Sequence, residues 1–166
     1  MKKMMRIVSL ALAVVMAASL AACGGGDGGP RADTVTLGAR LAERAEGLPD
    51  MTAVSSENEA ATGAELFPYL SDMDYAKVAG FYLSYATGGS PEEIALITVR
   101  DAADLAEARA SLERHLENRR NLFRTYDPEG EALLAKARLA SVGDTAALFV
   151  CENAAALESA FRAEIS

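Results

Sequence analysis

The sequence predicts an α+β domain in which helices pack on an antiparallel sheet of about four strands. Three observations predict this class. Residues 78–86 are rich in aromatic side chains and alternate between two faces, as a half-buried strand does. Residues 94–99 are apolar and β-branched on both faces, which is typical of a central strand. Residues 105–123 place leucine and phenylalanine on one side of a helix.

The N-terminal part of the domain predicts two helices and a short strand between them. Leucine and alanine recur at helical spacing over 37–48, where Gly47 and Pro49 favour an end. Residues 51–54 predict a strand. Ser56 is expected to cap a helix over 57–67, which Pro68 closes.

The long helix that follows the central strand has clear start and stop signals. Asp101 is expected to cap it, and it ends near Tyr126 because the residue before a proline avoids helical geometry. Asp127 can itself cap a second helix, with Pro128 in its first turn, that runs to about Ala137.

The C-terminal part repeats the order strand, strand, helix. Residues 139–142 and 145–151 predict a hairpin around Gly143 and Asp144, and Asn153 is expected to cap the last helix. Residues 96–108 and 148–160 share five of 13 positions at a constant offset of 52. The pattern indicates either a ββα half-repeat or two unrelated segments that make the same kind of turn from a strand into a helix.

The N-terminus predicts export. Residues 1–6 are basic and residues 7–22 form an apolar run, shorter than the about 20 residues that span a membrane, so 1–22 fit a signal peptide. Leu20-Ala21-Ala22-Cys23 resembles the bacterial lipobox, which implies a diacylglyceryl lipid on Cys23. Two acyl chains give stable anchoring. The alternative is an ordinary signal peptide whose cleavage site happens to precede a cysteine.

A glycine-rich stretch separates this cysteine from the domain. Residues 23–35 predict a lipidated cysteine and a flexible tether, with a typical span of about 19 Å over 24–35. Residues 36–166 are then a single extracytoplasmic domain. We expect it at the outer face of the cell membrane, with the bilayer as one partner through the acyl chains on Cys23.

Composition excludes several functions. The chain has 166 residues and a net charge of −8, and loss of the leader leaves 13 Lys and Arg against 24 Asp and Glu, a net charge of −11. Phosphates repel such a surface, so we expect no nucleic-acid partner. One histidine and two cysteines exclude a His/Cys zinc site and a disulfide framework, and we expect no metal and no cofactor.

Several of these pieces together resemble a known family. The lipobox, the EIALITV strand at 93–99, the TYDPE break at 125–129 and the final strand–helix pair resemble uncharacterised "domain of unknown function" lipoproteins of Gram-positive gut anaerobes. The resemblance covers most of the chain. It implies a membrane-anchored extracytoplasmic protein and supplies no catalytic residues.

Three residues are candidate ligand-binding residues. Arg109 and Arg119 lie about 40° either side of the centre of the apolar stripe, inside the face that should be buried, so they either snorkel around the core edge or line a groove for a carboxylate or phosphate. Tyr82 either faces a partner across an open sheet or is covered by the N-terminal helices.

The remaining candidates carry weaker signals. His115 lies at the edge of the stripe and could join Cys151, or a serine and an acid, in nucleophilic catalysis, whereas a boundary histidine and a buried thiol are the simpler interpretations. Asp72 and Asp74 have the spacing of a calcium-loop start, but the glycine and the final acid of that loop are missing.

The sequence therefore favours a non-catalytic binding or interaction module for an unknown envelope ligand or protein. The alternative is an extracytoplasmic hydrolase that acts on a cell-envelope substrate.

Overall fold

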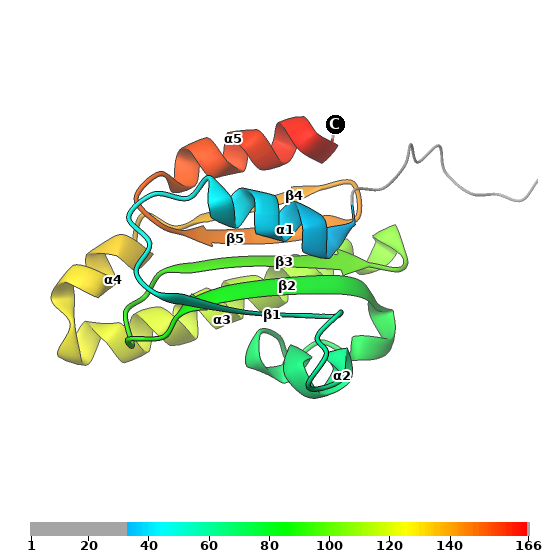
Figure 1. Ribbon diagram of the computed structural model, residues 1–166, viewed down its shortest axis with the longest axis horizontal. Coiled ribbons are helices and arrows are strands. Elements are labelled where there is room, and N and C mark those ends of the chain that lie inside the picture. Colours follow the sequence, from blue (N-terminus) through cyan, green and yellow to red (C-terminus); the bar gives the residue numbers. More distant parts are fainter. Residues whose placement is uncertain (1–32, 166) are drawn as a thin grey trace, which may run out of the picture.

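A five-stranded antiparallel sheet lies between two layers of helices (Figure 1). The computed structural model describes residues 33–165, so the predicted signal peptide, Cys23 and the tether up to residue 32 lie outside the described residues. The sheet order is β1-β2-β3-β5-β4. The predicted α+β class is confirmed, with five strands rather than about four.

The strands and helices follow one another as the sequence pattern predicts in most places. The strands are β1 (Met51–Ser55), β2 (Val78–Ala86), β3 (Glu93–Val99), β4 (Arg138–Val142) and β5 (Thr145–Val150). The α-helices are α1 (Thr34–Glu43), α2 (Gly63–Leu66), α3 (Leu105–Tyr126), α4 (Pro128–Leu134) and α5 (Ala154–Ile165). Short 3₁₀ turns lie at Phe67–Tyr69, Tyr75–Lys77 and Ala102–Asp104.

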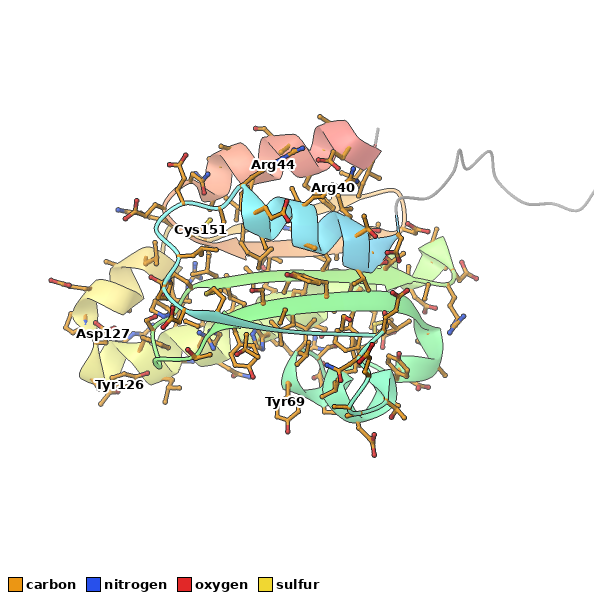
Figure 2. All side chains as sticks on the ribbon, in the orientation of Figure 1. Arg40, Arg44, Tyr69, Tyr126, Asp127 and Cys151 are labelled. Atoms are coloured by element: carbon orange, nitrogen blue, oxygen red, sulfur yellow. The ribbon has the colours of Figure 1, made fainter. Side chains whose placement is uncertain are left out.

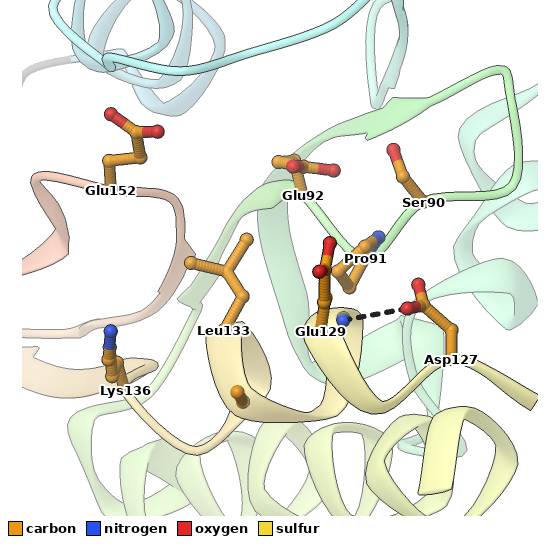
Figure 3. A pocket seen from close by; sticks show the side chains of 10 residues that line it. Ser90, Pro91, Glu92, Asp127, Glu129, Leu133, Lys136 and Glu152 are labelled. Carbon is orange, nitrogen blue, oxygen red and sulfur yellow. Dashed lines mark hydrogen bonds between the residues drawn. The ribbon is translucent and has the colours of Figure 1, made fainter. Parts of the chain in front are cut away.

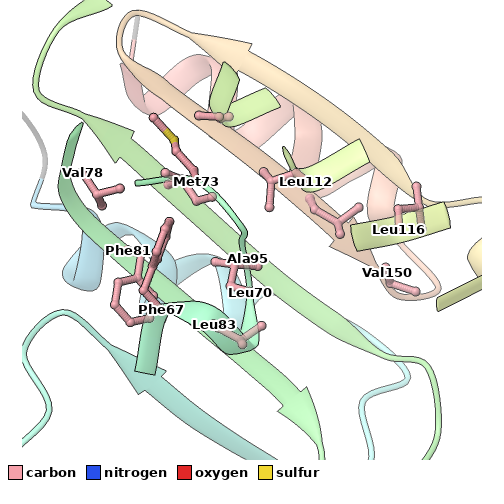
Figure 4. Close-up of a cluster of buried hydrophobic side chains, with 14 of the residues drawn as sticks. Phe67, Leu70, Met73, Val78, Phe81, Leu83, Ala95, Leu112, Leu116 and Val150 are labelled. Carbon is pink, nitrogen blue, oxygen red and sulfur yellow. The ribbon is translucent and has the colours of Figure 1, made fainter. Parts of the chain in front are cut away.

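Alternation along the strands divides the core into two clusters. On one face, Phe81 and Leu83 of β2 pack with Leu112 and Leu116 of α3 and with the segment around Phe67 (Figure 4). On the other face, α1 and α5 cover the side chains that point the opposite way from β2, β3 and β5. The alternation predicted for 78–86 is therefore confirmed.

The face under α1 shows why this helix contains a glycine. A Cβ atom at Gly38 would collide with the ring of Tyr82, so only glycine lets the helix lie this close to β2. Tyr82 is 7% exposed, so this residue is covered by a helix rather than open to a partner.

The chain enters the domain at one end of the sheet. The Asp33 carboxylate accepts a hydrogen bond from the Thr36 N–H and caps α1, which begins two residues before the predicted domain boundary at 36. The Thr34 hydroxyl donates to the Thr98 hydroxyl over 2.7 Å, and Thr98 contacts the Thr145 hydroxyl over 2.9 Å. These bonds fix the start of α1 at the end of β3.

The predicted helix over 57–67 is wrong for most of its length. Ser56 does not cap it: the Ser56 hydroxyl accepts a hydrogen bond from the Phe81 N–H over 3.3 Å and so belongs to the edge of β2. The helix begins instead at Gly63, where Thr62 and Glu65 form a reciprocal capping box.

Four other predicted ends or caps differ from the structure. The first helix ends at Glu43 rather than near residue 48, and α4 ends at Leu134 because β4 begins at Arg138. Asp101 caps a 3₁₀ turn that precedes α3 rather than α3 itself. The Asn153 amide does not cap α5, because it accepts from the Glu46 N–H and donates to the Arg44 carbonyl, which ties the α1–β1 loop to β5.

The two ββα units occur in the predicted order but are not related by a twofold axis. Ala95 and Leu148 pair across β3 and β5 and share a face. The offset of 52 instead equates Leu96 with Leu148, which lie in opposite core clusters. Accordingly α3 and α5 cover opposite faces of the sheet.

Candidate functional site

A cavity lies at the end of the sheet opposite to the start of α1. We call it the acidic cleft; its volume is about 580 Å³ (Figure 3). Three segments form it: the loop before β3, the α4 region and the turn after β5. Its lining residues are Ser90, Pro91, Glu92, Asp127, Glu129, Gly130, Ala132, Leu133, Lys136 and Glu152.

The α4 wall of the cleft is set by local sequence chemistry. Asp127 leaves helical geometry before Pro128, and its carboxylate accepts a hydrogen bond from the Gly130 N–H over 3.0 Å. A Cβ atom at Gly130 would lie 2.7 Å from the Phe123 ring and also collide with the Asp127 carboxylate. The tight break between α3 and α4 therefore requires glycine at this position.

Two arginines of α3 hold the other parts of the cleft in place. The Arg120 guanidinium donates to the Leu134 carbonyl at the end of α4 over 3.0 Å. The Arg119 guanidinium donates to the Ser90 carbonyl over 3.4 Å and stacks on the Phe123 ring at 5.5 Å. Both side chains thus support the walls of the cleft from behind.

The charge of the cleft is strongly negative. Four carboxylates line it, from Glu92, Asp127, Glu129 and Glu152, against the single ammonium group of Lys136. One oxygen of Glu92 has no accessible surface and no hydrogen-bond partner. The cleft therefore favours a cation over the carboxylate or phosphate considered for Arg109 and Arg119.

A second, smaller pocket lies beside α3, on the same face of the sheet. We call it the histidine pocket; its volume is about 170 Å³. It lies between α3 and the segment after Phe67. Its lining residues are Pro68, Leu70, Ser71, Asp72, Ser111, Arg114, His115 and Asn118.

Beneath this pocket lies a buried carboxylate. Glu93 begins β3 and is 1% exposed, while the His115 side chain is 17% exposed. His115 Nε2 lies 2.8 Å from Glu93 Oε1, and Arg119 Nε lies 3.4 Å from Glu93 Oε2. A carboxylate buried this deeply needs such partners.

Four other polar side chains of the histidine pocket are paired with each other. The Ser71 and Ser111 hydroxyls share a short hydrogen bond. Arg114 donates two hydrogen bonds to the Asp72 carboxylate, over 2.6 and 3.1 Å. The Arg114 guanidinium holds the pKa of the Asp72 carboxyl below its ordinary value.

The structure does not bring Arg109, Arg119 and Tyr82 together. Arg109 is exposed, and its guanidinium donates to the Leu139 carbonyl of β4 over 3.4 Å. Tyr82 lies on the opposite face of the sheet from Arg119, and burial raises the pKa of the Tyr82 hydroxyl. A ligand role for Arg109 stays a prediction.

The remaining candidates have structural partners. Cys151 is buried, its thiol donates to the side-chain oxygen Oδ1 of Asn153 over 3.3 Å, and burial raises the pKa of the Cys151 thiol to about 11. This is the simpler interpretation, a small buried hydrophobe. Asp74 caps a 3₁₀ turn through the Ala76 N–H rather than starting a calcium loop.

Sequence analysis missed the cleft and the partner of His115. Glu93 entered the sequence analysis only as the first residue of the EIALITV strand, although an acid at the first position of an entirely buried strand is a signal for a buried ion pair. The cleft gave no such signal, because its three walls come from segments about 16 to 60 residues apart in the chain.

Residues 33–165 contain neither a cluster of metal-binding side chains nor a helix that could span a membrane. No three His, Cys, Asp or Glu side chains in this range gather closely enough to hold a metal ion. No helix in it is both long and apolar enough to cross a membrane.

Comparisons with known proteins give one match. The family model DUF4358, a domain of unknown function, matches residues 52–151. No curated protein and no solved structure matches the chain. The matched range contains the sheet, α3 and α4, and leaves α1 and α5 outside.

Proposed function

This chain belongs to the DUF4358 family of domains of unknown function, and from that premise we propose that it is a membrane-anchored extracytoplasmic binding module whose acidic cleft takes an organic cation. The observation that carries the proposal is the acidic cleft itself. It combines a cavity of about 580 Å³ with four carboxylates and one ammonium group. A concave site with a few converging charged groups is the usual form of a small-ligand site.

An extended organic cation fits the cleft better than a metal ion. A metal needs several ligands within about 2.5 Å of one point. The described residues contain no such group of three, so the four carboxylates are spread along the walls. Two or more ammonium groups on one flexible chain can reach carboxylates that are separated in this way. We therefore take polyamines and lysine-bearing peptides as the ligand class.

The anchor rests on the N-terminal sequence. The basic start, the apolar run and Leu20-Ala21-Ala22-Cys23 occur in the order that a lipoprotein signal requires.

The expected orientation of the cleft follows from where the chain enters the domain. Thr34 is hydrogen-bonded to Thr98 at one end of β3, and the cleft lies beyond Glu93 at the other end. The two ends are about 17 Å apart along the strand.

This arrangement supports a module that presents its site outward. A lipid on Cys23 would hold the end of the domain that contains Thr34 near the bilayer. The acidic cleft would then open away from the membrane surface, toward the cell envelope. The anionic headgroups of the bilayer would not compete with it for cations as closely as they would at the other end.

Calorimetric titration of the full-length chain in detergent tests the cleft. Spermidine and trilysine are the probes. The Glu92→Gln and Glu152→Gln variants should each weaken binding about 2- to 5-fold, since an exposed charge pair contributes about 0.2–1 kcal/mol. Sodium chloride at about 0.5 M should abolish most of the binding through screening.

The matched control is Glu59→Gln, an exposed acid on the loop after β1, far from the cleft. It should bind both probes as the unaltered chain does. If Glu59→Gln weakens binding as much as Glu92→Gln does, the probes respond to net charge and the cleft is not a site.

Metabolic labelling with palmitate in a bacterial host that processes lipoproteins tests the anchor. The unaltered chain should carry label and partition into detergent, whereas Cys23→Ala should lose both properties. A chain that is exported and cleaved but carries no label would show an ordinary signal peptide instead.

A further inference from the structure

His115 and Glu93 form a second candidate site that is independent of the acidic cleft. We propose that His115 is a general base that activates water for hydrolysis of a short-chain ester in the histidine pocket. This inference goes beyond the binding role and does not depend on it.

The first argument is the orientation of the imidazole. Glu93 is a carboxylate beside the Arg119 guanidinium, so it accepts hydrogen bonds and the His115 Nε2–H donates to it over 2.8 Å. The proton on Nε2 leaves the lone pair on Nδ1. Among the described residues, Nδ1 makes no hydrogen bond and is not a buried atom without a partner. Because the ring lines the pocket, Nδ1 is open to a molecule bound there.

The hydrogen bond to Glu93 also holds the imidazole in place. Arg119 Nε lies 3.4 Å from Glu93 Oε2 and makes no hydrogen bond there, so among the described residues His115 is the side chain hydrogen-bonded to this carboxylate. A buried carboxylate bonded to one ring nitrogen fixes the tautomer and makes the other nitrogen a better proton acceptor. This is the arrangement in which a histidine acts as a base.

The residues around the imidazole also suit a reaction with an ester. Two ion pairs lie near the ring: Glu93 of β3 with Arg119 of α3, and Asp72, from the segment after Phe67, with Arg114 of α3. Arg114 and the Asn118 amide also line the pocket and can donate hydrogen bonds to an oxyanion. A volume of about 170 Å³ limits the substrate to a short acyl group.

The proposed step is a complete hydrolysis with water as the second reactant. The water oxygen attacks the ester carbonyl carbon while its proton moves to His115 Nδ1. The tetrahedral intermediate collapses, the bond between the carbonyl carbon and the alkoxy oxygen breaks, and the proton moves from Nδ1 to that oxygen. The products are a carboxylic acid and an alcohol.

Hydrolysis of p-nitrophenyl acetate and butyrate by the full-length chain in detergent tests the proposal. General-base catalysis contributes about 10²–10⁴-fold, so kcat/KM should exceed the rate constant of free imidazole by about 100-fold or more. His115→Gln should lose that factor. The control is Glu113→Gln, an exposed acid on the same helix, which should keep the full rate. A rate no higher than that of imidazole, or one that His115→Gln leaves unchanged, would overturn the proposal.

Nuclear magnetic resonance gives a second test that does not depend on activity. The chain contains one histidine, so its imidazole signals are assigned without ambiguity. The ¹⁵N shifts should show the Nε2–H tautomer, and the rate should rise with pH at the pKa measured for this ring. The Nδ1–H tautomer, or a rate that follows another ionisation, would contradict the role of His115.

The nucleophile is tested separately. A fluorophosphonate should leave the mass of the intact protein unchanged, because water is the proposed nucleophile. A covalent adduct on Ser71 or Ser111 would overturn that part of the mechanism.

Discussion

Arg119 connects the two candidate sites through a single side chain. It pairs with the buried Glu93 carboxylate, which holds His115, and it also binds the Ser90 carbonyl in the wall of the acidic cleft. Its guanidinium lies over the Phe123 ring. Arg119, for which the sequence left open a snorkelling stem or a groove for an anion, therefore lies beside a buried acid and supplies the opposite charge.

The two arginines of the stripe should differ sharply in their effect on stability. Arg119→Gln leaves the buried Glu93 carboxylate with His115 as its one remaining side-chain partner among the described residues, and we expect the free energy of unfolding to fall by about 2–3 kcal/mol. Arg109→Gln removes an exposed group and should stay within about 0.5 kcal/mol of the unaltered protein. Urea unfolding of both variants measures this. Equal effects would mean that Arg119 is not engaged with Glu93.

Cys151 should make stability fall at alkaline pH. Its pKa rises from an ordinary value of 9.0 to about 11 on folding because the thiol is buried. Between these values the unfolded chain releases the thiol proton and the folded chain keeps it, so stability decreases as pH rises through this range. Urea unfolding at pH 7 and pH 10 should show a smaller loss for Cys151→Ala. An identical loss would contradict the burial of the thiol.

At the scale of elements, α3 organises this face of the molecule. Its inner side packs on the sheet through Leu112 and Leu116, and its flank forms one wall of the histidine pocket. Its outer side is not covered: Leu122 and Tyr126 are exposed, as is Tyr69 on the neighbouring 3₁₀ turn (Figure 2). The same helix thus carries one leucine that is fully buried, Leu112, and one that is exposed, Leu122.

This separation predicts a matched pair of substitutions. Leu112→Ala removes a fully buried side chain and should lower the free energy of unfolding by about 2–5 kcal/mol. Leu122→Ala removes a side chain that is 59% exposed and should change it by about 0.5 kcal/mol or less. Thermal or urea unfolding gives both values. A large loss for Leu122→Ala alone would mean that the helix faces the sheet differently.

The elements with strong periodicity could be predicted from the sequence. The alternating β2 strand, the apolar β3 strand, the β4–β5 hairpin at Gly143 and the α3–α4 break at Pro128 all follow from local signals. The region 57–67 could not, because the Ser56 hydroxyl that resembles a cap is bound to β2, 25 residues later. A contact with another strand overrode the local pattern there.

The candidate sites depended even more on tertiary contacts. His115 was identified from the sequence, but its partner Glu93 lies on a strand 22 residues earlier, and nothing local links the two. Glu152 meets Glu92 and Asp127 only because β5 pairs with β3 and α4 folds back at the same end of the sheet. Composition showed an acidic chain without showing where the acids gather.

At the scale of the whole molecule, the entry of the chain and the acidic cleft lie at opposite ends of the sheet. Asp33 and Thr34 fix the start of α1 beside the end of β3, and the cleft lies beyond the start of the same strand. A chain held at its N-terminus would present the cleft to the surroundings of the cell. The central claim is therefore that this cleft, and not the acidic surface in general, binds organic cations.

A ¹⁵N–¹H correlation spectrum of the full-length chain, titrated with spermidine, tests this claim most directly. We expect saturable chemical-shift changes that are confined to residues 90–92, 127–136 and 152. These changes should vanish in about 0.5 M sodium chloride. Absent shifts, or shifts spread over distant acids such as Glu57 and Glu59, would contradict it.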